Sequence, residues 1–169
     1  MLAADIREKA RLNYASESRA AIIKTLATDG TLSMVLYRLM QGSREIGATP
    51  LEMFFNKLNS GLGNCVIGRG AEFGPGFVIF HSSGIVINGK VKAGDHVHLH
   101  HEVTIGDDLD GGVPTLGSHI HVGAGAKIIG GVNVADGARI GANAVVVKNV
   151  EPHTTVVGIP AREVRRRQG

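Results

Sequence analysis

Four histidines that lie close together in the sequence are candidates for metal binding or for acid–base catalysis. His96, His98, His100 and His101 lie within the single segment HVHLHH. Imidazole nitrogens bind zinc, and an imidazole can also accept a proton near neutral pH. His96 and His101 have a His-x4-His spacing suited to a shared metal ion, but a catalytic zinc needs a third ligand and an open position for water. In the preceding repeats, the histidine available as a third ligand is His81.

These histidines lie inside a sequence repeat with a period of six. Thirteen large apolar residues keep this spacing, which by chance would occur on the order of once in ten thousand when half of all residues are apolar. They are Ile67, Phe73, Ile79, Ile85, Val91, Val97, Val103, Leu116, Val122, Ile128, Val134, Ile140 and Val146. A period of six fits neither a helix nor an alternating strand, so it predicts a coil of short flat faces, the parallel β-helix.

The corners of this coil are indicated by small residues. A Gly or Asn stands three residues after ten of the thirteen apolar positions. These are Gly70, Gly76, Asn88, Gly94, Gly106, Gly125, Gly131, Gly137, Asn143 and Asn149. Because Gly and Asn tolerate positive φ, each repeat is expected to be a short strand followed by a sharp corner. The three exceptions are Ser82, His100 and His119.

The first sixty residues follow a helical pattern instead. Residues 32–40 carry an apolar stripe with helical spacing, which stops at Gly42. Residues 49–52 read TPLE, a capping box with Pro at the first helical position, and this helix is expected to end near Gly61. Residues 16–27 are also expected to be helical. Short helices need a surface to pack on, so they should cover one end of the β-helix or contact another subunit.

These patterns divide the chain into three parts. An α-helical N-terminal region is expected over residues 1–60, a β-helix over 61–164 and a basic tail over 165–169. The fold class is therefore all-β with a short helical N-terminal region. The single Cys65 excludes an internal disulfide and lies among Val and Ile, where a buried, inert thiol is expected.

Composition excludes several functional classes. The formal net charge is only +3, and the basic excess is concentrated in the last eight residues, so the balance gives little reason to expect a nucleic-acid partner. The chain has no run of about eighteen apolar residues, and its N-terminus is too charged for a signal peptide. We therefore expect no membrane insertion and a cytoplasmic location.

Three segments of the second half carry the motifs of a known enzyme family. Residues 123–130 read GAGAKIIG, residues 140–142 read IGA, and residues 152–162 read PHTTVVGIPAR. From about residue 61 to 164 the chain resembles the serine acetyltransferase branch of the hexapeptide-repeat acyltransferases. The resemblance implies a left-handed triangular β-helix, a homotrimer with active sites between subunits, and acetyl transfer from acetyl-CoA to the hydroxyl of a small-molecule acceptor. It implies no metal, and a hexamer would depend on the N-terminal helices.

The resemblance assigns the role of catalytic base to His81. The family's histidine begins a His-x-x-Gly-Ile-Val segment, and residues 80–86 read FHSSGIV. An alcohol is a poor nucleophile at neutral pH, and an imidazole with a pKa of about 6.5 can take its proton as the thioester is attacked. The family's aspartate partner, fifteen residues upstream, is replaced by Val66, and the acidic residue before the histidine by Phe80. Four other carboxylates are candidate partners that the sequence does not rank: Glu72, Asp95, Glu102 and Asp107.

The acceptor side of the site also departs from the family. The family's loop carries an Arg-His-Pro element that holds the substrate carboxylate, whereas residues 111–114 read GGVP. A free amino acid would lose a charge-assisted pair of hydrogen bonds there. The sequence therefore predicts that free serine is a poor acceptor, and a sugar or polysaccharide hydroxyl is the alternative.

The residues expected to bind acetyl-CoA match the family's motifs more closely than the residues on the acceptor side do. By resemblance, the backbone at Gly106, Ala124 and Ala142 lies along the pantetheine arm of CoA. Lys148 and Arg162, together with Lys127 and Arg139, are candidates for neutralising the CoA phosphates. Two hypotheses from other classes stay open: a trimeric zinc enzyme of the gamma carbonic anhydrase type, and a non-catalytic β-helix scaffold.

Overall fold

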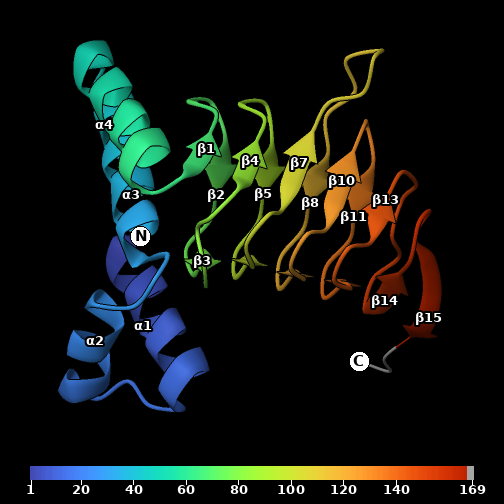
Figure 1. Ribbon diagram of the computed structural model, residues 1–169, viewed down its shortest axis with the longest axis horizontal. Helices are drawn as coiled ribbons and strands as arrows, with labels where there is room; N and C mark the ends of the chain where they lie inside the picture. Colours follow the sequence, from blue (N-terminus) through green and yellow to red (C-terminus); the bar gives the residue numbers. More distant parts are fainter. Residues whose placement is uncertain (167–169) are drawn as a thin grey trace.

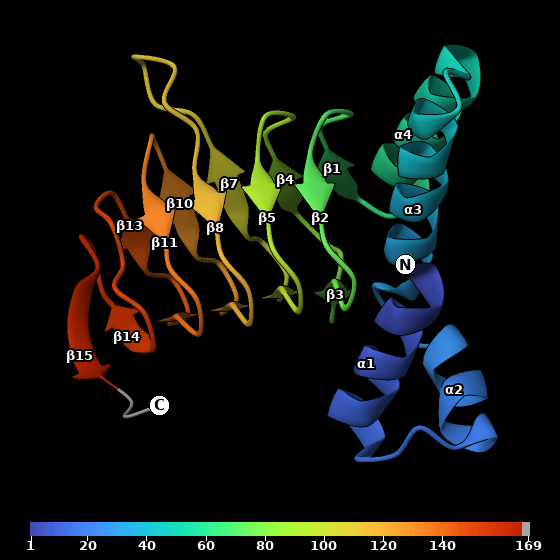
Figure 2. The same cartoon turned by 180° about the vertical axis from the view of Figure 1, so that it is seen from behind.

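The computed structural model describes residues 1–166, which form a helical region followed by a three-sided β-helix (Figure 1). The helices in these residues are α1 (Leu2–Tyr14), α2 (Arg19–Leu26), α3 (Thr31–Glu45) and α4 (Thr49–Leu62). They lie together at one end of the β-helix, and the C-terminal strands lie at the other end (Figure 2). None of the helices described in this range is long and apolar enough to cross a membrane.

The strands stack into three sheets, one for each face of the coil. The first face holds β1 (Cys65–Ile67), β4 (Ile85–Ile87), β7 (Thr104–Gly106), β10 (Lys127–Ile129) and β13 (Val145–Val146). The second holds β2 (Glu72–Phe73), β5 (Lys92–Ala93), β8 (Thr115–Leu116) and β11 (Asn133–Val134). The third holds β3 (Val78–Ile79), β6 (His98–Leu99), β9 (His121–Val122), β12 (Arg139–Ile140), β14 (Thr154–Val157) and β15 (Arg162–Arg166). Only β15, paired with β14, is antiparallel among these strands, so the predicted parallel β-helix is confirmed.

The repeat residues form the core of the β-helix. All thirteen apolar residues that keep the spacing of six are at most 3% exposed. The core continues into the helices through Tyr37 of α3, whose ring centroid lies 5.9 Å from that of Phe73 and 5.3 Å from that of Phe77. The Tyr37 hydroxyl donates to the Ala71 carbonyl at 3.1 Å and accepts from the Phe73 amide at 3.0 Å. The helices thus close the first coil of the β-helix.

The corners use small residues in two different ways. Four of the ten expected Gly and Asn corners have positive φ: Gly76, Gly125, Gly137 and Asn143. The other six do not, so positive φ is wrong as a general account of the corners. At Gly94 an added Cβ would lie 2.4 Å from Ser118 Oγ, and at Gly70 it would lie 2.5 Å from the Gly89 carbonyl oxygen. Glycine is needed there because neighbouring coils approach closely.

The N-terminal region departs from the helices expected from the sequence. The patterns do not predict α1, because Asp5 and Lys9 have the character of solvated residues but are fully buried. Helix α3 also continues three residues past Gly42, to Glu45. At the other end of the chain, β15 extends to Arg166, and residues 167–169 of the expected basic tail lie outside the described residues.

Candidate active site

His81 lies at the corner between β3 and β4, where the third face meets the first. Its side chain is 56% exposed, and its Nδ1 lies 3.0 Å from Oδ2 of Asp29, which stands two residues before the start of α3. The ring of His101, one coil further on, has its centroid 5.9 Å from that of His81. A carboxylate at Nδ1 fixes the orientation of an imidazole and favours Nε2 as the nitrogen that exchanges a proton. The local geometry therefore suits a general base at an open corner.

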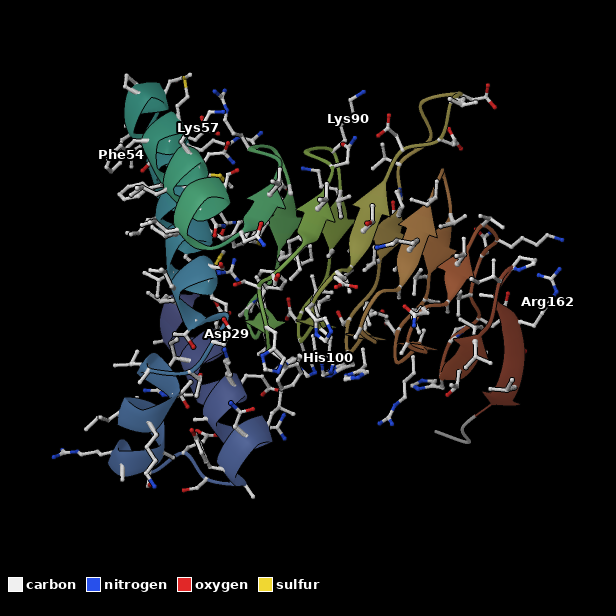
Figure 3. The ribbon with its side chains drawn as sticks, viewed as in Figure 1. Asp29, Phe54, Lys57, Lys90, His100 and Arg162 are labelled. Atoms are coloured by element: carbon white, nitrogen blue, oxygen red, sulfur yellow. The ribbon has the colours of Figure 1, made fainter. Side chains whose placement is uncertain are left out.

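Asp29 reaches His81 because the loop before α3 is fixed against β3. Gly30 has a φ of 75°, and an added Cβ would lie 2.3 Å from the Ile79 carbonyl oxygen, so only glycine allows this approach. The Gly30 amide donates to Asp29 Oδ1 at 2.8 Å, which leaves Oδ2 for His81. The position of Asp29 between the helices and the first coil is visible in Figure 3.

Lys9 of α1 supports the same loop from the other side. Its ammonium group donates to the Asp29 backbone carbonyl and, at 3.0 Å, to Thr31 Oγ1. Burial lowers the pKa of Lys9 to about 8, and the Asp29 carboxylate partly opposes this shift. Helix α1 therefore helps to position Asp29, although no part of α1 contacts His81 in the hydrogen bonds described.

Asp29 corrects the sequence-based choice of a partner for His81. The carboxylate that contacts the imidazole belongs to Asp29. It is not one of the four candidates from the sequence, which are Glu72, Asp95, Glu102 and Asp107. Glu72 pairs with Lys92, and Asp107 accepts from Asn88 Nδ2 at 2.8 Å. Asp29 is 52 residues from His81 and lies in the helical region, so the repeat could not indicate it. The available signal was the Asp29-Gly30 pair, a turn dipeptide directly before a helical stripe.

A groove runs over the next corners on the same side of the coil. Its volume is about 410 Å³, and both Ala124 and Ala142 line it together with His100, His121 and Arg139. The Asn143 amide donates to the Ala124 carbonyl at 2.8 Å, so the two alanines occupy the same corner of successive coils. The structure thus brings Ala124 and Ala142 together in one groove. Gly106 does not line this groove and lies at the far end of β7.

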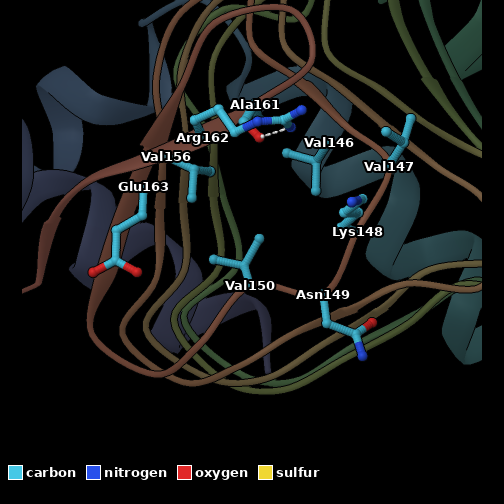
Figure 4. Close-up of a pocket in the computed structure, with 9 residues that line it drawn as sticks. All are labelled: Val146, Val147, Lys148, Asn149, Val150, Val156, Ala161, Arg162 and Glu163. Carbon is cyan, nitrogen blue, oxygen red and sulfur yellow. Dashed lines mark hydrogen bonds between the residues drawn. The ribbon is translucent and has the colours of Figure 1, made fainter.

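Lys148 and Arg162 line a separate, smaller pocket near the C-terminal end (Figure 4). This pocket has a volume of about 230 Å³ and is closed on its inner side by Val146, Val150 and Val156. The Arg162 guanidinium donates to the carbonyl of the preceding Ala161 at 3.0 Å. The expected CoA-binding residues therefore do not form one cluster: Ala124 and Ala142 line the groove, Lys148 and Arg162 line the smaller pocket, and Gly106 lines neither.

The histidines form a row across the third face. The ring of His100 stacks on Phe80 with a centroid distance of 4.7 Å and packs edge-on against His121 at 5.1 Å. Burial lowers the pKa of His100 and of His121, and it lowers the pKa of His98 to about 4 despite the nearby Glu8 carboxylate. Burial thus disfavours the protonated form of all three imidazoles.

The histidines expected to share a metal ion are separated within the chain. The ring of His96 stacks on that of His119 at a centroid distance of 4.8 Å, whereas His101 packs beside His81. The pair with His-x4-His spacing therefore does not form a common site within one chain. His96 instead faces α1, where it approaches Glu8.

Comparisons with known proteins identify the family. No family model matches the sequence. The chain is 32% identical over 168 residues to the serine acetyltransferase of Synechococcus elongatus, covering 98% of this chain and 68% of that protein. It is 42% identical over 102 residues to the serine acetyltransferase of Mycobacterium tuberculosis, covering 59% of this chain and 44% of that protein. A crystal structure of serine acetyltransferase from Brucella abortus in complex with coenzyme A has a TM-score of 0.88 and 26% identity, covering 98% of this chain and 66% of that one.

The match extends over both the helices and the β-helix but not over the whole length of these relatives. The chain spans between 44% and 64% of the length of several of the curated relatives that it matches. The coil of this chain matches the left-handed β-helix of those enzymes, as the sequence motifs predicted. From the shared sequence over nearly its full length and the shared fold, this chain belongs to the serine acetyltransferase family.

Proposed function

We propose that this protein is an acetyl-CoA-dependent O-acetyltransferase in which His81 is the general base. The observation that carries the proposal is the His81–Asp29 pair, 3.0 Å apart, at an open corner of the coil. The groove of Ala124 and Ala142 is connected to this corner through His100, which lines the groove and stacks on Phe80, the residue before His81. Family membership supports acetyl transfer, since the relatives are named serine acetyltransferases and one was crystallised with coenzyme A.

The proposed reaction is one acyl transfer. Nε2 of His81 accepts the proton of the acceptor hydroxyl as its oxygen attacks the carbonyl carbon of acetyl-CoA. The carbon–sulfur bond breaks, and the leaving thiolate takes the proton from the imidazolium. Asp29 holds the imidazole in position and stabilises its protonated form during the step. A thiol-release assay with acetyl-CoA and a panel of serine and sugar acceptors tests this activity. Release that never exceeds the rate without acceptor would favour the non-catalytic scaffold.

We place the CoA pantetheine arm in the groove of Ala124 and Ala142, with Lys148 and Arg162 of the smaller pocket as cations for the phosphates. Gly106, which does not line the groove, has no part in this placement. CoA should raise the melting temperature, because a ligand at 100 times its Kd stabilises the folded state by about 2.7 kcal/mol. Replacing Ala124 or Ala142 with Leu should remove most of this shift, since the added side chain occupies the groove.

The matched control for the groove is Ala135→Leu. Ala135 lies at a different corner of the same β-helix and does not line the groove. The control should keep the CoA-dependent shift in melting temperature measured for the native chain. If Leu at both Ala124 and Ala142 leaves that shift intact, the cofactor binds elsewhere.

The acceptor that fits this site best is a neutral hydroxyl, although serine in the relatives' name makes L-serine the first acceptor to measure. Phe80 stands directly before His81 and is stacked on His100, so position 80 offers no carboxylate to an ammonium group. Residues 111–114 carry no guanidinium for a substrate carboxylate. We therefore expect kcat/KM to be at least tenfold higher for a neutral sugar hydroxyl than for L-serine, measured by thiol release. Efficient turnover of L-serine below millimolar concentration would contradict this.

We further propose that the chain assembles as a homotrimer. Val66 of β1 and Val86 of β4 are register partners on the first face, and they are 45% and 46% exposed. Adjacent apolar side chains on a sheet surface are typical of a covered interface. Phe54, which is 55% exposed and points away from the β-helix (Figure 3), offers a further contact by which trimers could pair into a hexamer. Sedimentation should give the mass of at least three 17.7 kDa chains, and a monomer at micromolar concentration would contradict the assembly.

A further inference from the structure

A second group of chemically active side chains lies between α1 and the third face of the β-helix, apart from His81. It consists of Glu8 from α1 with His96 and His98 from the coil that contains β6. His98 Nε2 lies 3.2 Å from Glu8 Oε1, and His96 Nδ1 lies 3.5 Å from Glu8 Oε2. One ligand atom from each of the three residues lies within 4.8 Å of the other two. The three side chains therefore converge on one point.

The two imidazole nitrogens that face Glu8 have no hydrogen-bond partner within the described part of the chain. His96 Nδ1 and His98 Nε2 are both buried and unpaired among the residues that the structure describes. Their contacts with Glu8 are close, but they do not meet hydrogen-bond geometry. Buried polar atoms are nearly always paired with protein, water or an ion. Two such atoms aimed at the same carboxylate indicate a ligand between them.

The backbone at His96 has positive φ, as it does at the equivalent corner of the other coils. His96 has a φ of 54°, a conformation that is uncommon for residues other than glycine. At the equivalent corner of other coils, Gly76 and Gly137 take this conformation with φ of 79° and 71°, and His119 and His153 take it with φ of 58° and 55°. The chain therefore has an imidazole at a corner where glycine would be less strained.

Arg11 is the group already bound to Glu8. Its Nη2 lies 2.6 Å from Oε1 and 2.8 Å from Oε2 of the carboxylate. The Arg11 side chain is 56% exposed and approaches from the solvent side, whereas the histidines approach from the coil. A cation between Glu8 and the histidines would weaken one Arg11 contact, and the exposed guanidinium is free to shift outward.

We propose that Glu8, His96 and His98 form a binding site for a divalent transition-metal ion. Two imidazole nitrogens and a carboxylate oxygen are a ligand set that zinc uses, with further positions taken by water. A cleft of about 770 Å³ lined by Glu8, His98 and His119 gives the ion access to solvent. The ion would join α1 to the β-helix within a single chain, and the site does not depend on the proposed acetyl transfer.

Zinc binding by two matched glycine variants tests the site. The full chain, without a polyhistidine tag, is dialysed against micromolar Zn²⁺, and bound zinc and melting temperature are measured. His96→Gly removes a ligand, and His119→Gly removes its stacking partner at the equivalent corner, where φ is 58°. Both variants should fold, because glycine suits this conformation. The native chain and His119→Gly should bind about one zinc per chain and melt at a higher temperature with Zn²⁺, whereas His96→Gly should bind at least tenfold more weakly.

Cobalt provides a measurement that reports directly on coordination. Co²⁺ added to the native chain should give visible ligand-field absorption, and His98→Gln and Glu8→Gln should weaken it. A native chain that binds neither ion at micromolar concentration would overturn the proposal. Equal zinc affinity of His96→Gly and His119→Gly would also overturn the proposal, provided that His96→Gly has the native melting temperature in the absence of metal.

Discussion

His81→Ala should lower kcat for acetyl transfer by about a hundredfold to ten-thousandfold, the range for removal of a positioned general base. The KM for acetyl-CoA should change little, because His81 does not line the groove of Ala124 and Ala142. An effect confined to kcat is the signature of an interaction made in the transition state and not in the bound ground state. Steady-state thiol release with the best acceptor measures both parameters.

Three further variants separate the role of a base from a structural role. His81→Asn keeps a hydrogen-bonding group but cannot titrate, so it should be as slow as His81→Ala. Asp29→Asn should lower kcat by a smaller factor, about tenfold, because the pair is more than half exposed and solvent can partly replace the carboxylate. His119→Ala is the control, because it removes a histidine that does not lie at the corner of His81. Retention of most of the acetyl-transfer rate by His81→Ala would reject the assignment of the base.

The β-helix could be predicted from sequence because its core has a simple rule. Each short face contributes one inward aliphatic residue, so the spacing of six from Ile67 to Val146 follows directly from the geometry of the coil. The repeat carries no information about the direction in which the N-terminal helices pack. The sequence therefore does not predict helix α1. Its buried residues include Asp5 and Lys9, whose partners lie in other elements.

The candidate site also has a part that could be predicted from the sequence and a part that could not. Ala124 and Ala142 could be placed in one groove because equivalent positions of successive coils must stack. His81 could be placed at a corner for the same reason, by its position in the repeat. Asp29 could not, because its approach depends on the contact between Gly30 and the Ile79 backbone, a tertiary feature with no periodic signal. The Glu8 contacts with His96 and His98 likewise require the position of α1.

Asp5→Ala should lower the free energy of unfolding by about 3–5 kcal/mol, the range for breaking a buried ion pair by removing one partner. Asp5 is fully buried, and its carboxylate accepts from Arg38 Nε at 2.7 Å and Nη2 at 3.1 Å. It also accepts from the amides of Gly76 and Phe77 at 2.9 and 3.0 Å. Its removal would leave a buried guanidinium and two buried amides without their acceptor.

Arg38 cannot compensate for this loss by moving to solvent. Its guanidinium also donates to the carbonyls of Phe73 and Gly74, at 2.7 and 2.6 Å, and so joins α3 to the first coil. Urea unfolding at one fixed protein concentration measures the change, which keeps any contribution from assembly constant. Asp110→Ala, at an exposed loop position, should change stability by less than about 0.5 kcal/mol.

The same substitution should also affect the proposed active site. Asp5 and Lys9 lie on one helix, and Lys9 donates to the Asp29 carbonyl, so loosening α1 should free the loop that holds Asp29 beside His81. We therefore expect Asp5→Ala to lower kcat at temperatures where the protein is still folded, with CoA binding retained in the distant groove. An Asp5→Ala chain within 1 kcal/mol of the native stability would show that α1 is not fixed to the β-helix through this ion pair.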